Sequence, residues 1–250
     1  MNTARSAPTA PPEPRMSGQT VVVLGGSAGI GLETARQARG EGADVLLVGR
    51  DPDRLGHAAA EVGARGTAAF DATDPEQLRR FFAELPEPVD HVMVTAGGNY
   101  YTRLADLDFD RARRQVEDHI WLPLHLARAA VGRIRPAGTL LFMGGVQRRP
   151  GLGMIVSGAL TAALPALIAN LALEVAPVRA NLIAAGFVDT PLSARLLGDD
   201  LEQRREQLRA TLPVGRVVAP GDVAALAVHL MTNPVLTGGT YDIDGGQQLL

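Results

Sequence analysis

Residues 21–31 read VVVLGGSAGIG, and this stretch decides the fold of the chain. The apolar run Val21–Leu24 predicts a buried strand of a parallel sheet. Gly25, Gly29 and Gly31 then mark places where the backbone turns tightly or lies close to another group, because glycine has no Cβ atom. A helix that begins near Gly29 would point its first unpaired N–H groups at an anion. The stretch therefore predicts a pyrophosphate site, and glycines kept for packing alone are the alternative.

The residues after this turn complete a strand–helix–strand unit. A helical pattern covers Leu32–Arg39, and Asp44–Val48 is a second apolar strand. The position just past the second strand often selects the cofactor: an acidic residue bonds the 2′-hydroxyl of NAD, whereas an arginine accommodates the 2′-phosphate of NADP. This residue is Arg50, which favours NADP(H) over NAD(H). An ordinary solvated charge is the alternative for Arg50.

Strands and helices continue to alternate along the chain. Further strands are expected at Gly66–Phe70, Val89–Thr95, Thr139–Met143, Val178–Ala184 and Thr240–Ile243. Helices are expected at Asp53–Val62, Pro75–Glu84, Leu104–Arg133 with an interruption at Pro123, Ile155–Ala176, Thr190–Thr211 and Pro220–Thr232. This alternation predicts a single-domain α/β fold over residues 18–250, a Rossmann-type doubly wound parallel sheet. The helix Ile155–Ala176 is apolar almost all the way round, which is typical of a helix covered on both sides. We therefore expect a homo-oligomer, either a dimer or a tetramer.

Composition limits the kinds of partner. The 250 residues include no cysteine and no lysine, and the 24 basic residues nearly balance 27 acidic ones. Cysteine catalysis is excluded, no metal site is predicted, and neither nucleic acid nor a membrane surface is expected as a partner. Residues 1–17 are rich in Ala and Pro and lack the apolar core of a signal peptide, so we expect a disordered tail. We also expect no apolar stretch of the roughly 20 residues that a membrane span needs, and therefore a cytoplasmic protein.

Several motifs together resemble the short-chain dehydrogenase/reductase family, from about residue 18 to residue 250. LGGSAGIG resembles the glycine motif of that family with Leu24 in place of Thr, and the segment Thr95-Ala96-Gly97 resembles its Asn-Ala-Gly segment. Asp71 matches an Asp that contacts the adenine, although it is also placed to cap a helix. AAGFVDTPL and YDIDGG are similar to segments near the last two strands. The resemblance implies NADP(H) bound by Gly25, Ser27, Gly29, Ile30, Gly31, Arg50, Asp71, Ala96, Gly97, Gly186, Val188 and Thr190.

The catalytic part departs from the family pattern. The acid of the family is a Tyr that a Lys four residues later makes more acidic, with a Ser that polarises the carbonyl and an Asn that supports a proton relay. The resemblance places Ser157 at the Tyr, Thr161 at the Lys, Gly144 or Gly145 at the Ser, and His119 at the Asn. Because the chain contains no lysine, no other alignment restores the Tyr–Lys pair. We therefore predict poor reduction of simple ketones.

Three side chains are candidates for proton transfer in place of that set. His119 is the first, because imidazole changes its charge near physiological pH; a histidine satisfied by packing is the alternative. Tyr100 follows the fourth strand at its carboxyl end, where open α/β sheets bind ligands, although packing at the rim also explains a loop tyrosine. Ser157 occupies the position of the Tyr, but a serine hydroxyl is too weakly acidic to act alone. Arg148 and Arg149 are placed to hold a carboxylate or phosphate of the substrate, and a solvated pair of arginines is the more common alternative.

Three functions are compatible with these residues. We favour an NADP(H)-dependent oxidoreductase that acts on a small organic substrate through a non-standard proton path. A redox-neutral isomerase or cyclase that keeps the dinucleotide as a structural part is one alternative. A non-catalytic NADP(H)-binding subunit is the other. Turnover of NADPH separates the first function from the other two.

Overall fold

The computed structural model describes residues 14–146 and 150–250. They form one seven-stranded sheet in the order β3-β2-β1-β4-β5-β6-β7, and every neighbouring pair of strands is parallel. The strands are β1 (Thr20–Leu24), β2 (Asp44–Gly49), β3 (Gly66–Ala69), β4 (Val89–Val94), β5 (Ile134–Gly145), β6 (Arg179–Ala185) and β7 (Thr240–Ile243). The predicted single-domain, doubly wound α/β fold is confirmed.

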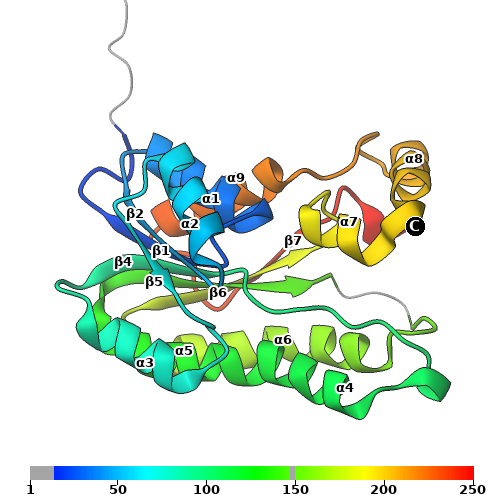
Figure 1. The fold of residues 1–250 in the computed structure, drawn as a ribbon, viewed down its shortest axis with the longest axis horizontal. Coiled ribbons are helices and arrows are strands. Elements are labelled where there is room, and N and C mark those ends of the chain that lie inside the picture. Colours follow the sequence, from blue (N-terminus) through cyan, green and yellow to red (C-terminus); the bar gives the residue numbers. More distant parts are fainter. Residues whose placement is uncertain (1–13, 147–149) are drawn as a thin grey trace, which may run out of the picture.

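Helices cover both faces of the sheet (Figure 1). One layer holds α1 (Gly29–Gly40), α2 (Pro52–Val62) and α9 (Pro220–Thr232), and the other holds α3 (Pro75–Glu84), α4 (Phe109–Val116), α5 (Leu122–Ala130) and α6 (Ile155–Glu174). Two more helices, α7 (Pro191–Leu197) and α8 (Leu201–Thr211), lie near the end of the sheet toward which the strand arrows point (Figure 1).

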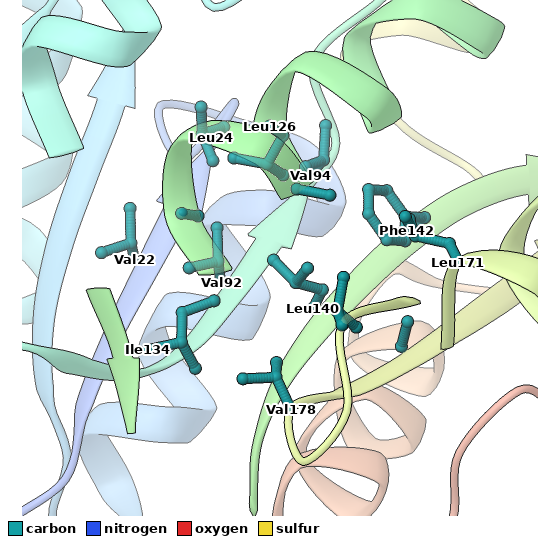
Figure 2. Packing of buried hydrophobic residues seen from close by; sticks show 14 of the residues in the cluster. Val22, Leu24, Val92, Val94, Leu126, Ile134, Leu140, Phe142, Leu171 and Val178 are labelled. Atoms are coloured by element: carbon teal, nitrogen blue, oxygen red, sulfur yellow. The ribbon is translucent and has the colours of Figure 1, made fainter. Parts of the chain in front are cut away.

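The hydrophobic core lies on both sides of the sheet because successive strand residues point to opposite faces. Val22 and Leu24 of β1 belong to the cluster that α3, α5 and α6 cover, part of which Figure 2 shows. Val21 and Val23 belong to the second cluster, beneath α1, α2 and α9. A strand buried on both faces needs a continuous apolar run, and this requirement explains the sequence VVVL.

The prediction of a helix over Leu104–Arg133 interrupted by Pro123 is wrong at its start, and the interruption lies directly before Pro123. The helix begins only after Asp108, whose carboxylate accepts hydrogen bonds from the backbone N–H groups two and three residues later. It is then interrupted by a π-helical segment, Glu117–Trp121, in which the N–H of Leu122 donates to the carbonyl five residues earlier. This wider turn brings Pro123 into the first turn of α5, where a missing N–H costs little.

The predicted helix Thr190–Thr211 is also divided, because Gly198 has a φ of +53° and ends α7. The fifth strand is longer than predicted and begins at Ile134. The remaining strand boundaries differ from the predicted ones by a residue or so. Element ends are set by local capping and tertiary pairing, which a periodic pattern does not encode.

The folded domain begins before residue 18. Residues 1–13 lie outside the described residues, but Met16 is fully buried, and its N–H donates to the Glu41 carbonyl at 2.9 Å. Arg15 also pairs with the Glu41 carboxylate at 2.6 Å. Residues 14–17 therefore belong to the folded domain, which corrects the boundary predicted for the tail.

Helix α6 corrects the expectation that the chain has no apolar stretch of roughly 20 residues. Within the described residues it is the one helix that is long and apolar enough to cross a bilayer, judged by length and composition alone. Its inward side chains are buried, and three of them pack in the core against the sheet: Leu164, Ile168 and Leu171. The outward side chains are exposed in the single chain and are also apolar: Ala159, Ala162, Ala163, Ala166, Ala169 and Leu173.

Candidate functional site

The glycine turn after β1 is packed against the end of β4. The N–H of Thr95 donates to the Leu24 carbonyl at 2.8 Å, and its hydroxyl lies 3.2 Å from the carbonyl oxygens of Leu24 and Gly25. A Cβ added to Gly31 would overlap the Gly25 carbonyl and lie 2.7 Å from the Thr95 hydroxyl. Gly25 has a φ of +91°, and a Cβ there would lie 2.9 Å from the backbone nitrogen of Ala96. Both glycines are therefore required to close the turn.

The first turn of α1 is open at the carboxyl edge of the sheet. Its N-cap residue, Ala28, provides no side-chain hydrogen bond, and no acidic residue lies in the first turn. In contrast, the carboxylates of Asp51, Asp74 and Asp108 cap α2, α3 and α4. Uncapped N–H groups at the positive end of a helix dipole attract an anion. The turn thus fits a pyrophosphate, as predicted from the sequence.

Thr190 is the residue of the β6–α7 connection that comes closest to this turn. Its side chain would lie 3.6 Å from a Cβ on Gly29, which has a φ of +57°. Gly186 is explained by packing instead, because a Cβ there would lie 2.7 Å from the Cβ of Asp244. Val188 is buried in the core. Among these candidates, the structure brings Thr190 to the glycine turn, while Gly186 and Val188 support the connection.

Arg50 follows β2 at the same edge. The hydroxyl of Ser27 reaches this strand end and would lie 3.6 Å from a Cβ on Gly49. The neighbouring acid, Asp51, directs its carboxylate to the N–H groups at the start of α2, at 3.1 Å. Arg50 itself is exposed and has no hydrogen-bond or ion-pair partner within residues 14–146 and 150–250. The strand end therefore offers an available positive charge, while one carboxylate oxygen of Asp51 caps α2.

Asp71 does not cap a helix. One of its carboxylate oxygens accepts from the N–H of Thr73 at 3.0 Å and from the Thr73 hydroxyl at 2.8 Å, while Asp74 caps α3. The other oxygen has no protein donor among the described residues. This arrangement leaves a hydrogen-bond acceptor for the adenine amino group that the resemblance implies.

Asp118 is a site residue that the sequence analysis missed. Its Oδ2 accepts from the N–H of Gly98 at 2.9 Å, and its Cβ would lie 3.4 Å from a Cβ on Gly97. Burial raises the pKa of Asp118, the charge of Asp71 adds to this rise, and the Gly98 N–H opposes it. Asp118 belongs to the π-helical segment, a kind of irregularity that is frequent at functional sites. Its place directly before His119 is the one signal that the sequence offers.

The hydroxyl of Ser157 holds the loop between β4 and α4. This side chain is 7% exposed, and its Oγ donates to the Tyr100 carbonyl at 2.9 Å. The buried amide of Gln115 lies 3.1 Å from the same Oγ. With this amide turned to satisfy its neighbours, it bonds the N–H and the carbonyl of Tyr100, both at 3.2 Å. By the resemblance, Ser157 stands at the position of the family's Tyr, and its hydroxyl makes a hydrogen bond that holds the loop.

The phenol of Tyr100 is also engaged within this loop. Its oxygen accepts from the N–H of Asp108 at 3.0 Å and donates to the carbonyl of Asp106 at 3.3 Å. The guanidinium of Arg111 stacks on the ring at 4.2 Å. Both hydroxyls thus bond the loop in this geometry, and the proton-donor roles of Tyr100 and Ser157 stay predictions.

His119 keeps one ring nitrogen available. Its Nδ1 lies 2.9 Å from the carbonyl of Gln115, and since a carbonyl can only accept, Nδ1 carries the hydrogen. The half-buried ring has no partner for Nε2 among the described residues. Thr161, at the position of the Lys, would lie 3.3 Å from a Cβ on Gly145. Arg148 and Arg149, predicted to hold the substrate, lie outside the described residues.

Comparisons with known proteins match nearly the whole chain. The family model described as Enoyl-(Acyl carrier protein) reductase matches residues 25–248. Galactitol 2-dehydrogenase (L-tagatose-forming) from Cereibacter sphaeroides is 31% identical, with 93% of this chain and 96% of the relative covered. The crystal structure of BdcA in complex with NADPH is 27% identical, with a TM-score of 0.82 over 93% of this chain and 95% of that chain. The structure of MalC Reductase/Diels-Alderase from Malbranchea aurantiaca, 22% identical, shares the fold with a TM-score of 0.87 over 95% of this chain and 99% of that chain.

Proposed function

Since this chain belongs to the short-chain dehydrogenase/reductase family, we propose that it is an NADP(H)-dependent oxidoreductase acting on a small organic substrate. The observation that carries the proposal is the open first turn of α1 beside the glycine turn, at the sheet edge where such folds bind dinucleotides. Arg50 supports NADP(H), because an arginine without a protein partner can bind a 2′-phosphate through charge-assisted hydrogen bonds. The related BdcA structure contains NADPH, which supports the same cofactor.

The residues around the turn fit this cofactor. Because Gly25 and Gly31 have no Cβ, the backbone stays close to the N–H groups that would receive the pyrophosphate. By the resemblance, Asp71 would bond the adenine and Thr190 the nicotinamide carboxamide, with Ala96 and Gly97 forming the floor between them. NADPH, when bound, supplies a hydride. The protein must then provide the proton.

His119 is the proposed source of that proton. When its ring is protonated, Nδ1–H remains bonded to the Gln115 carbonyl and Nε2–H is free to donate. A positioned general acid contributes about 10²- to 10⁴-fold in rate. Without the Tyr–Lys pair, this site suits a substrate that needs less help from an acid than a simple ketone does, such as an iminium ion or a conjugated alkene.

Titration with NADPH and NADH, followed by fluorescence, tests the cofactor assignment. We expect tighter binding of NADPH. Oxidation of NADPH in the presence of iminium ions, conjugated alkenes and ketones then tests the reaction class, with the ketones reacting slowest. Absence of NADP(H) binding would overturn the proposal, and rapid reduction of unactivated ketones would overturn the proton path.

A redox-neutral isomerase or cyclase is the second candidate. The observation that favours it is that Ser157 and Tyr100 use their hydroxyls in the loop, so that His119 is the one proton donor left of the three candidates. The fold neighbour MalC is a Reductase/Diels-Alderase, and its likeness to this chain carries the fold alone. Substrate consumption without NADPH oxidation would identify such an enzyme. NADPH binding without any turnover would instead indicate a regulatory subunit.

We further propose a homo-oligomer that covers the outward face of α6. This face is exposed and apolar in the single chain, and a second copy is the simplest cover for it. Light scattering tests the assembly, and Ala169→Arg should weaken it. A wild-type monomer would contradict this part of the proposal. The cytoplasmic location stays a prediction.

A further inference from the structure

A hollow of about 490 Å³ lies beside the start of α6. This volume falls within the range of about 300–1,000 Å³ that is usual for small-molecule sites. Most of the side chains that line it are apolar, and they come from three segments of the chain: Leu104, Val146, Leu152, Met154, Ile155 and Ala162. An apolar wall of this extent favours an apolar ligand, because a polar ligand would lose its hydration there without replacement.

The hollow reaches the carboxyl end of β5. Val146 follows that strand directly, and Thr161 also contributes to the wall. Thr161 lies against the strand end, 3.3 Å from a Cβ on Gly145. By the resemblance, Thr161 corresponds to the Lys of the family, and Gly144 or Gly145 corresponds to its Ser. A ligand in the hollow would therefore have one end where the proposed reaction occurs.

Within residues 14–146 and 150–250, one positive charge lies in this apolar wall. Arg103 is the one ionisable residue among the described residues that line the hollow. Its guanidinium has no hydrogen-bond or ion-pair partner in the part of the chain that the structure describes. The neighbouring first turn of α6 adds to the positive potential, because Met154 provides no side-chain cap and the turn contains no acidic residue. An arginine with these surroundings complements an anionic group.

We propose that the hollow binds an apolar molecule that carries one acidic group, with the acidic group held by Arg103, and that this molecule is of the substrate class of the enzyme. The identification as substrate rests on the proposed function. The binding itself does not, because it depends only on the hollow and Arg103. The two can therefore be tested separately.

Two fluorescent probes that differ in one group test the binding. 1-Anilinonaphthalene-8-sulfonate carries a sulfonate, whereas N-phenyl-1-naphthylamine has the same rings and no charge. Both are titrated into the full-length protein with saturating NADPH, so that the cofactor site is not available to them. We expect Arg103→Gln to weaken the sulfonate probe about tenfold and to leave the neutral probe unchanged. Arg80→Gln, which removes an exposed charge from α3, is the matched control and should change neither.

Filling the hollow, or replacing part of its apolar wall by a polar side chain, should weaken both probes. Leu152→Trp adds a large ring from an 81% exposed position outside α6, so the fold should tolerate the change, and Leu104→Ser makes the wall more polar at a 68% exposed position. Equal loss of both probes in Arg103→Gln, or unchanged binding in both Leu152→Trp and Leu104→Ser, would overturn the inference. NADPH affinity should stay unchanged in all four variants. Probe binding by a protein that does not bind NADPH would refute the proposed function while leaving the hollow as a binding site.

Discussion

The carboxyl edge of the sheet has a cofactor half, at the ends of β1, β2 and β3, and a catalytic half, next to α4 and α6. Polar groups of the first half lack protein partners in the part of the chain that the structure describes, whereas those of the second half are mostly hydrogen-bonded within the protein. Around β1 and β2, the fold leaves polar groups without protein partners: the first N–H groups of α1, the guanidinium of Arg50 and one oxygen of Asp71. Around α4 and α6, it engages the groups at the catalytic positions: Ser157 bonds the Tyr100 carbonyl, and the Tyr100 phenol bonds the loop backbone. A group that the fold has already satisfied has less to offer a ligand.

This difference indicates where a ligand contributes to the structure. Partly buried polar groups are normally hydrogen-bonded, so the first N–H groups of α1 and the second oxygen of Asp71 favour a ligand at this edge. The catalytic half needs no such partner to be stable. Its loop is closed by internal hydrogen bonds, and of the predicted donors His119 keeps a ring nitrogen without a partner among the described residues.

The largest loss of NADPH affinity is expected from a substitution that fills the glycine turn of the cofactor half. Gly31→Ala places a Cβ onto the Gly25 carbonyl, so the turn must shift. Because displacements of about 1 Å at such sites can cost about 10²-fold, we expect NADPH affinity to fall at least a hundredfold. Overpacking should also lower the free energy of unfolding by about 1–3 kcal/mol. Nucleotide titration and urea unfolding measure the two effects.

Gly40→Ala, at the other end of α1, is the matched control. Nothing lies within 4 Å of a Cβ at this position, so nucleotide affinity should not change. Stability should change by no more than about 1 kcal/mol. Similar losses in the Gly31 and Gly40 variants would show that α1 tolerates no alanine in general and that the turn is not special.

A loss of about two orders of magnitude in kcat/KM is expected for His119→Gln on a substrate whose reduction requires a proton, such as a conjugated alkene, because the one available proton donor is removed. Tyr100→Phe should stay within a few-fold of wild type, since its hydroxyl serves the loop. Rates of both variants compared across pH measure this contrast. A larger loss in Tyr100→Phe than in His119→Gln would show that the Tyr100 hydroxyl takes part in the reaction and does not only bond the loop.

A smaller and more selective effect is expected for Arg50→Ala. NADPH affinity should fall about tenfold, because a hydrogen bond to a charged group contributes about 1.5–3 kcal/mol. NADH affinity should stay the same, since that cofactor has no 2′-phosphate. If the ratio of the two dissociation constants does not change, Arg50 is an ordinary solvated charge.

The smallest effect concerns Asp118, which joins the two halves. Asp118→Ala should weaken NADPH about fivefold, the equivalent of one hydrogen bond of about 1 kcal/mol, whereas Asp118→Asn keeps an acceptor for Gly98 and should bind normally. Glu117→Ala, an exposed neighbour, is the control. Equal affinities in Asp118→Ala and wild type would show that the Gly98 tether is not needed.

The stability of the Asp118→Asn variant should depend on pH in a defined direction. Burial raises the pKa of Asp118, so the folded state retains a proton that the unfolded state releases. The free energy of unfolding of wild type therefore falls as pH rises through the interval between the two pKa values. The Asn variant lacks this loss and should be more stable than wild type at neutral pH, with the difference shrinking in acid.

Much of the fold could be predicted because its determinants are local. The run Val21–Leu24 and the helical pattern Leu32–Arg39 show their periods within a few residues, and the glycine turn lies between them. The long helix was predicted wrongly because an Asp108 cap and a π-helical turn depend on particular contacts. Met16 was assigned to the tail because its neighbours are Pro-rich, yet its side chain is fully buried in the core beside α1 and α2.

Local pattern and composition were sufficient for the parallel sheet, the glycine turn and the absence of the Tyr–Lys pair, since a chain without lysine cannot build that pair in any fold. The roles of the remaining polar residues required three-dimensional packing. Ser157 meets Tyr100 across 57 positions of sequence, and Asp118 meets Gly98 across 20. Whether a hydroxyl or carboxylate is free for a ligand depends on such distant partners, because hydrogen bonds form over about 3 Å of space regardless of separation along the chain.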